Sequence, residues 1–139
     1  MAYDLKRFLD AQRYDYDLAL SEMKAGRKKS HYIWYIFPQL KGLGFSSMSD
    51  YYGISSLSEA KAYMEDPVLR ARLLEITEVL LENPCQDIKK IMPYPDDLKL
   101  CSSMTLFSIS NPEETVFSSV LEKYFHGKKD QQTLKLLGL

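Results

Sequence analysis

A chain of 139 residues is within the usual size of one domain and is long enough to bury a sizeable hydrophobic core. Its hydrophobic content of 45% and charged content of 27% are ordinary for a globular protein in water. The net charge of -1 supplies no broad basic field, which argues against partners such as duplex nucleic acid or an acidic membrane surface.

The first predicted element is a long amphipathic helix. Apolar residues recur at helical spacing from Asp4 to Gln12, and the pattern continues as far as Met23. Gly26 follows, and glycine often ends helices because it adopts the left-handed conformation without strain. We therefore expect this helix to stop at Gly26.

The next segment, residues 31–37, is a block of aromatic and branched side chains. It is too short and too uniformly apolar for its periodicity to separate a buried strand from a buried helix. Ser30, as an N-cap, favours a short helix. Residues 40–50 form a predicted loop, because the glycines and serines there supply turn chemistry.

Two start signals open the middle of the chain. Residues 56–59 (SLSE) match a capping box, after which we expect a helix over residues 60–65. The pair Asp66-Pro67 is the second signal, since proline is favoured at the first helical position. The helix that follows has the clearest amphipathic pattern in the sequence and should end before Asn83. Its predicted buried face consists of Leu69, Leu73, Ile76 and Leu80.

The last part of the chain begins with a short apolar patch at residues 88–92, whose type the pattern leaves open between prolines. Asp96 is the predicted N-cap of a helix that runs to about Ser108. Its apolar face is predicted to hold Leu100, Cys101, Met104 and Phe107. Its other side gathers Asp96, Lys99, Ser102 and Ser103.

The final predicted helices lie beyond residue 110. Residues 111–114 (NPEE) are a start signal, and residues 116–125 carry an apolar stripe that Gly127 should end. Asp130 is expected to cap a last helical segment over residues 133–137.

Together these elements predict a single, mainly α-helical domain over residues 1–139, with six to eight short helices and little or no sheet. The two cysteines have no CxxC or zinc-site spacing, which favours buried thiols in a reducing compartment over a disulfide. The two histidines are far apart in the sequence, and we expect no metal and no cofactor. No signal peptide or transmembrane run is visible, so the expected location is cytoplasmic.

The segment from Gly26 to Leu40 is the most informative in the chain, because three cations and a histidine run directly into aromatic residues. Flat aromatic faces beside cations suit a planar, charged ligand such as a nucleotide. Each residue type also has an ordinary structural explanation: aromatic residues fill cores, lysines are solvated, and a histidine can be a hydrogen-bonded structural residue. The candidate ligand contacts are Lys28, Lys29, Ser30, Tyr32, Trp34 and Gln39, with His31 as a candidate catalytic group.

The helix predicted to open at Asp96 provides the second candidate group. A carboxylate beside a like charge suits acid–base work, so Asp96 and Asp97 are candidate catalytic residues. Both are equally suited to a structural role, as first-turn anions on the helix dipole. The polar side of this helix either lines a pocket or is a solvated outer face. The candidate ligand contacts here are Lys99, Ser102, Ser103 and Thr105.

These segments together resemble one known family. The resemblance rests on residues 26–39 (GRKKSHYIWYIFPQ), residues 42–46 (GLGFS), residues 96–107 (DDLKLCSSMTLF) and residues 130–137 (DQQTLKLL), among others. The chain is identified on this basis as a member of the domain-of-unknown-function family eighteen-ten, which is sometimes mislabelled calpastatin. The resemblance spans nearly the whole chain, and the family has no established activity.

The chain is also distantly similar to the NADAR superfamily, whose mostly helical members act on N-glycosides of ribose phosphates and on ADP-ribose adducts. Ser30-His31 stands only loosely in place of the Glu-His pair of that superfamily. Within the nearer family, Asp66 replaces a usual histidine, Pro93 a usual glycine and Cys101 a usual arginine. Loss of that arginine removes a natural phosphate-binding fork.

The distant similarity implies a hydrolase of N-glycosidic bonds in a nucleotide, ribosyl-phosphate or ADP-ribose derivative. In this hypothesis Asp96 or Asp97 stabilises an oxocarbenium-like centre, and His31 donates a proton to the leaving base. The lysines would hold phosphate, and Trp34 or Tyr32 would stack on the base. Two alternatives stay open: a non-catalytic module that binds the same ligands, and a protein-interaction domain with the aromatic block as core. The oligomeric state and the substrate are not determined by the sequence.

Overall fold

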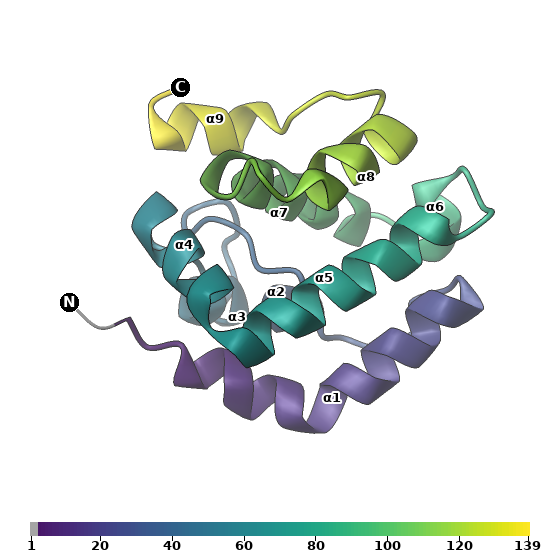
Figure 1. Cartoon of the computed structure of the whole chain (residues 1–139), viewed down its shortest axis with the longest axis horizontal. Helices are drawn as coiled ribbons and strands as arrows, with labels where there is room; N and C mark the ends of the chain where they lie inside the picture. The colour runs from purple at the N-terminus through teal and green to yellow at the C-terminus, as the bar shows by residue number, and fades with distance from the viewer. Residues whose placement is uncertain (1–2) are drawn as a thin grey trace.

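The computed structural model describes residues 3–139 and consists of helices joined by loops (Figure 1). The nine helices of this part of the chain are α1 (Lys6–Ala25), α2 (Ile33–Ile36), α3 (Ser47–Tyr52), α4 (Leu57–Glu65), α5 (Pro67–Glu82), α6 (Ile88–Ile91), α7 (Asp96–Ser110), α8 (Thr115–Phe125) and α9 (Gln131–Leu137). Residues 3–139 contain no strand, only an isolated parallel bridge between Leu40 and Ile54. The mainly helical fold predicted from the sequence is confirmed; Met1 and Ala2 lie outside the described residues.

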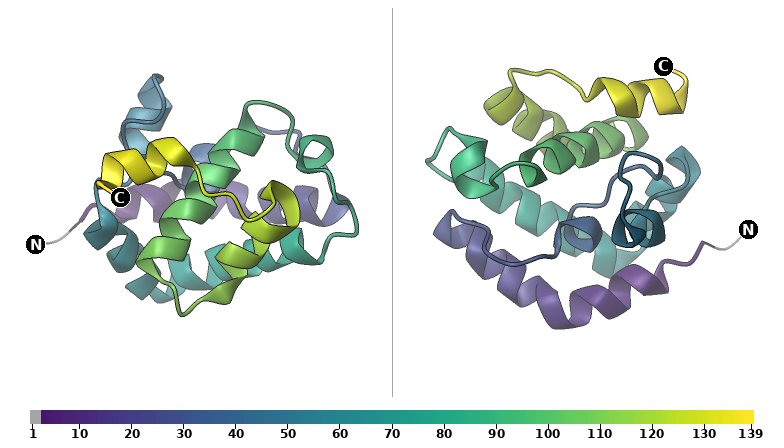
Figure 2. Two further views of the ribbon diagram at one scale, coloured as in Figure 1. Left: turned by 90° about the horizontal axis from the view of Figure 1, so that it is seen from above. Right: turned by 180° about the vertical axis from the view of Figure 1, so that it is seen from behind.

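The helices are stacked so that α5 lies between α1 and α8, while α7 contacts α8, α4, α9 and α2 (Figure 1). The rear view shows the short helix α2 and the loop after it lying between α1 and the C-terminal helices (Figure 2). This arrangement brings the segment before α2 close to the start of α7, two regions that are far apart in the sequence. Within residues 3–139, no helix combines the length and the apolar content needed to cross a bilayer.

Several helix ends follow the predicted capping signals. Gly26 ends α1 with a φ of 80°, and its N–H donates to carbonyls of the last helical turn. The Asp66 carboxylate accepts from the N–H groups of Val68 and Leu69 at the start of α5. Asp130 caps α9 by accepting from Thr133. These ends were predictable because each capping bond joins residues only a few positions apart.

Three predicted starts were wrong. Ser30 does not cap α2: Tyr32 holds that position, and the Ser30 hydroxyl donates to Glu22 instead. Asp96 is the first residue of α7 and not its N-cap, a place taken by Pro95. Residues 111–114 form the turn before α8, which begins only at Thr115. In each case a polar residue was free to make a different bond in the folded chain.

The predicted loop over residues 40–50 contains the start of α3. Ser46 caps this helix, because its hydroxyl accepts from the N–H of Ser49. The serine-rich composition therefore reports a helix cap and not a turn alone. The short patch at residues 88–92, left open by the sequence, forms the single-turn helix α6.

The predicted apolar face of α5 is confirmed, since all four of its residues are at most 1% exposed. The helix α7 is different from the prediction, because most of its polar residues are buried as well. Ser103 and Thr105 are fully buried, and Asp97 is only 3% exposed. The interpretation of the polar side as a solvated outer face is therefore wrong for most of α7. This helix runs through the interior, with only a few residues at the surface.

Candidate functional site

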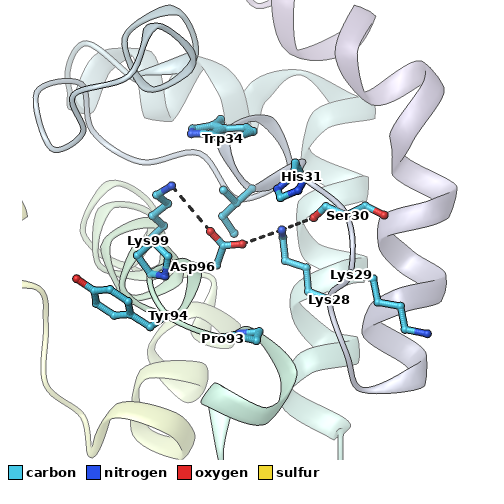
Figure 3. Close-up of a pocket in the computed structure, with 11 residues that line it drawn as sticks. Lys28, Lys29, Ser30, His31, Trp34, Pro93, Tyr94, Asp96 and Lys99 are labelled. Carbon is cyan, nitrogen blue, oxygen red and sulfur yellow. Dashed lines mark hydrogen bonds and ion pairs between the residues drawn. The ribbon is translucent and has the colours of Figure 1, made fainter.

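A cavity of about 350 Å³ lies where the segment before α2 meets the start of α7 (Figure 3). It is lined by Lys28, Lys29, Ser30, His31, Ile33, Trp34, Pro93, Tyr94, Pro95, Asp96 and Lys99. We call it the first cavity. It joins seven of the residues proposed from the sequence, which come from two segments about sixty positions apart.

The carboxylate of Asp96 stands between two ammonium groups in the first cavity (Figure 3). Asp96 Oδ2 lies 2.7 Å from Lys28 Nζ, and Asp96 Oδ1 lies 3.8 Å from Lys99 Nζ. The Asp96 side chain is 20% exposed, so it reaches the cavity, whereas the Lys28 side chain is only 4% exposed. Lys28 is therefore committed to holding Asp96 in place, and Lys99 is the cation that has more room to turn toward a ligand.

Aromatic rings stand beside both of these lysines. Lys99 Nζ lies 5.2 Å from the centre of the Trp34 ring, and Lys28 Nζ lies 4.6 Å from the centre of the Tyr32 ring. The Trp34 indole N–H is buried and has no acceptor within residues 3–139. Trp34 thus offers the first cavity its ring and not its hydrogen-bond donor.

His31 is exposed and lies at the edge of the first cavity, between Ser30 and the Trp34 ring (Figure 3). It lines the same cavity as Asp96 and the lysines, and its role as a proton donor stays a prediction. Lys29 also lines the cavity, but its side chain is exposed and points outward from the wall (Figure 3).

The wall is anchored by Glu22, a residue of α1 that the sequence did not single out. Its Oε1 accepts from the N–H of Lys29 at 2.7 Å, from the N–H of Ser30 at 3.2 Å and from the Tyr32 hydroxyl at 2.7 Å. Its Oε2 accepts from the Ser30 hydroxyl at 2.7 Å. Burial alone would raise the pKa of Glu22, but these hydrogen bonds outweigh it and lower the pKa to about 2.

This anchor explains the positions of Ser30 and Tyr32. Burial, together with the bond to the Glu22 carboxylate, raises the pKa of the Tyr32 hydroxyl above its usual range, so it remains a donor. Tyr32 is 1% exposed and does not line the first cavity. It cannot stack on a ligand there, and its role in the fold is to brace the wall.

Asp97, Ser103 and Thr105 were also proposed from the sequence, but the structure does not bring them to the cavity. All three are buried and line neither the first cavity nor its neighbour. Thr105 accepts from the backbone N–H of Asp130 and so fastens the loop before α9. The Asp97 carboxylate acts on Cys101 instead: burial, and then the carboxylates of Asp130 and Asp97, raise the pKa of the Cys101 thiol to about 11.

Gln39 and Ser102 lie in a second cavity of about 370 Å³ next to the first. The two cavities share Tyr94, Pro95 and Lys99, so the predicted residues lie along two adjoining hollows and not around one. Tyr94 was missed by the sequence analysis, although it is a tyrosine between two prolines, a setting that favours exposure.

Other features of the described chain bear on the predicted chemistry. Cys85 and Cys101 are free thiols and are half-buried, so the predicted burial is only partial. Residues 3–139 contain no group of three or more His, Cys, Asp or Glu side chains placed to hold a metal ion.

Comparison with known proteins connects the chain to proteins without an assigned activity. A search of curated proteins finds no match. The crystal structure of the conserved hypothetical protein Rv1873 from Mycobacterium tuberculosis is 45% identical in sequence, with a TM-score of 0.96 over 99% of this chain and 98% of that chain. The similarity to the NADAR superfamily stays a prediction. The family described as protein of unknown function (DUF1810) matches residues 2–137, and the chain therefore belongs to this family.

Proposed function

We propose that the protein hydrolyses the N-glycosidic bond of a nucleotide, ribosyl-phosphate or ADP-ribose derivative bound in the first cavity. The observation that carries the proposal is the composition of the wall: three lysines, one carboxylate, an indole ring and a histidine line one hollow of about 350 Å³. The buried Glu22 behind the wall lowers the excess of positive charge but does not cancel it. An anionic ligand with a reacting centre near Asp96 fits this arrangement.

The chemistry assigned to each group follows from its charge and place. The bond between the sugar C1′ and the base nitrogen breaks, and its electron pair leaves with the base, which takes a proton from His31. The positive charge that develops at C1′ is stabilised by Asp96, and water adds to that carbon and releases a proton, which returns to His31. Lys99 attracts the phosphate within the cavity, the exposed Lys29 adds positive charge at its edge, and Lys28 holds Asp96. Asp97 receives no role, because it is closed off from the cavity.

A non-catalytic binding module is the second candidate, and one observation favours it. Both oxygens of Asp96 are already close to ammonium groups, at 2.7 Å and 3.8 Å. A carboxylate paired in this way stabilises positive charge on a reacting carbon less than an unpaired carboxylate does. In that case the first cavity would hold the same ligand class without turnover. For either function we expect the reducing, cytoplasmic setting predicted from the sequence, with which two free thiols are in keeping.

The deciding experiment measures hydrolysis and binding on the same protein. Purified wild type is assayed for release of base or ribose from ADP-ribosylated and ribosyl-phosphate substrates, and for thermal stabilisation by the same compounds. Asp96→Asn should reduce turnover about 100-fold or more, because the lost charge acts on the transition state. Ligand-induced stabilisation should persist. Asp17→Asn, an exposed residue of α1, is the matched control and should behave as wild type.

Each result has a distinct meaning. Stabilisation without any turnover by the wild type would reject the hydrolase for those substrates and leave the binding module. Absence of both would contradict the ligand-binding site itself and favour the interaction domain. Turnover that survives unchanged in Asp96→Asn would remove Asp96 from the reaction.

A further inference from the structure

The second cavity lies beside the first and has a different character. The lysines and His31 dominate the first cavity, whereas the second is lined on one side by Leu43, Phe45 and Leu98. Its volume of about 370 Å³ is within the range of small-molecule pockets. Because Lys99 and Tyr94 line both, one ligand can extend from one cavity into the other.

The mouth of the second cavity exposes large apolar side chains. Phe45 is fully exposed, Tyr94 is 73% exposed and Leu98 is 51% exposed. Large apolar side chains are usually at least partly buried, so three of them around one hollow indicate a surface that gains contacts on binding. The loop that carries Phe45 packs closely against α3. At Gly44 this close approach requires glycine, because a Cβ there would clash with the Ser49 side chain.

Gln39 supplies the hydrogen-bonding group of the second cavity. The residue is only 8% exposed and lines this cavity, and its side-chain amide makes no hydrogen bond within residues 3–139. The amide atoms are not among the fully buried atoms that lack a partner, so they are open to the cavity and free to bond a ligand there. An amide offers one donor and one acceptor side by side, which matches the edge of a heteroaromatic ring.

The charges of the second cavity balance. Lys99 and Asp130 are its charged side chains, and the Asp130 carboxylate already caps α9 by accepting from Thr133. The Ser102 hydroxyl donates to the Leu98 carbonyl and so can only accept from a ligand. This environment suits a neutral group with ring-edge donors and acceptors, unlike the cationic first cavity.

We propose that the second cavity binds the neutral planar ring of a two-part ligand, with the Gln39 amide hydrogen-bonding to the edge of the ring and Phe45 and Tyr94 in contact with it. The anionic sugar-phosphate part lies in the first cavity, and this placement rests on the proposed function. The ligand class is then a nucleotide that keeps a nucleobase, and not a bare ribose phosphate. Gln39 selects the base.

The test uses three probes that separate the cavities: adenosine for the second, ribose 5-phosphate for the first, and adenosine 5′-monophosphate for both. Dissociation constants are measured by calorimetry for wild type, Gln39→Met and Phe45→Ala. Gln39→Met keeps the length of the side chain and removes its hydrogen bonds. Both variants should weaken binding of the two adenine-bearing probes about fivefold to twentyfold, and ribose 5-phosphate by less than about twofold.

Two controls keep the result independent of folding and of catalysis. Gln131→Met makes the same change at an exposed glutamine that lines neither cavity, and all its constants should stay at wild-type values. Phe45 is fully exposed, so Phe45→Ala leaves the fold intact even where Gln39→Met does not. The assignment would be overturned if both variants bound ribose 5-phosphate and adenosine with equally weakened affinity, or if both bound adenosine as the wild type does. It would also be overturned if adenosine did not bind the wild type. Failure of ribose 5-phosphate to bind, with adenosine binding that depends on Gln39, would instead contradict the proposed function and leave the ring site in place.

Discussion

The interior around α5 and the wall of the first cavity bury their side chains in opposite ways. On α5 the buried residues are apolar except for Thr77, and Leu69, Leu73, Ile76 and Leu80 are at most 1% exposed. In the wall the buried groups are charged: Glu22 and Lys28 are each 8% exposed. The first region gains stability from apolar area removed from water, while the second must balance each charge with a particular partner.

This difference separates the two regions by function. An apolar interior tolerates many side chains of similar volume, because its contacts are not directional. A charged wall does not, since a buried charge without its partner is costly. The interior therefore sets how stable the fold is, and the wall sets where the lysines and Asp96 stand. Substitutions in the two regions should therefore affect stability and ligand binding differently.

The largest effect is expected in the interior. Leu73→Ala should lower the free energy of unfolding by about 2–5 kcal/mol, because a fully buried leucine leaves a cavity when truncated. Urea denaturation measures it, with Leu136→Ala as control, since Leu136 is 52% exposed and should change stability by less than about 0.5 kcal/mol. Ligand binding per folded molecule should be unchanged in both variants. An effect of Leu73→Ala below that of the control would refute the apolar interior.

The next effect concerns the anchor of the wall. Glu22→Gln keeps the size of the side chain but weakens four charge-assisted hydrogen bonds, and should cost about 1–3 kcal/mol near neutral pH. Glu78→Gln, on the exposed side of α5, is the control and should be nearly neutral. Unlike Leu73→Ala, the Glu22 variant should also weaken ligand binding, because the segment that carries the lysines loosens.

The same variant has a defined pH dependence. The pKa of Glu22 is lowered from about 4.5 to about 2 in the folded protein, so its ionisation stabilises the fold above pH 4.5 and this contribution is lost as the pH falls toward 2. The stability difference between wild type and Glu22→Gln should therefore be constant above about pH 5 and shrink below it. A difference that stays constant down to pH 3 would show that the carboxylate charge contributes nothing.

Two adjacent lysines offer a matched pair within the wall. Lys28→Met leaves Asp96 without its close partner and should cost about 1–2 kcal/mol of stability, less than a fully buried pair because Asp96 is 20% exposed. Lys29→Met removes an exposed charge and should cost less than about 0.5 kcal/mol. Thermal unfolding of both variants decides this, and equal effects would contradict the distinct roles assigned to them.

These regions also differ in how far the sequence predicts them. The buried face of α5 was predictable because the spacing of its four apolar residues is a local property of a helix. Glu22 was not, since two of its four donors are backbone N–H groups, which every sequence contains, and nothing in the pattern sets it apart from the aspartates of α1. The interaction depends on how the chain turns after Gly26, and that turn is set by tertiary packing.

The two carboxylates at the start of α7 show the same limit. Asp96 and Asp97 are chemically identical, and the sequence assigned both to the site. Successive residues of a helix point about 100° apart, so only one of them can face the first cavity. Which one does so depends on where the helix begins. The sequence placed Asp96 at the N-cap, one position before its actual place as the first helical residue, and so did not separate the two carboxylates. The resemblance to a family located the segment but did not give the orientation.

The smallest effect on stability, with a clear effect on binding, is expected at Lys99. Its ammonium group lies 3.8 Å from Asp96 and 5.2 Å from the Trp34 ring centre, and its side chain is 24% exposed. Lys99→Met should change stability by less than about 0.5 kcal/mol. Affinity for adenosine 5′-monophosphate should fall about fivefold to tenfold, because this lysine lines both cavities. Lys61→Met, at an exposed position of α4, should leave affinity unchanged.

The bond between Glu22 and residue 29 has a consequence for redesign of the protein. The donor is the backbone N–H of Lys29, so every amino acid except proline can make the same bond. The exposed side chain at that position can therefore be exchanged for a neutral or acidic one while the segment keeps its anchor. Position 29 is the place where an engineer, or natural variation, can retune the charge of the first cavity and hence the kind of anion it admits, without rebuilding the scaffold.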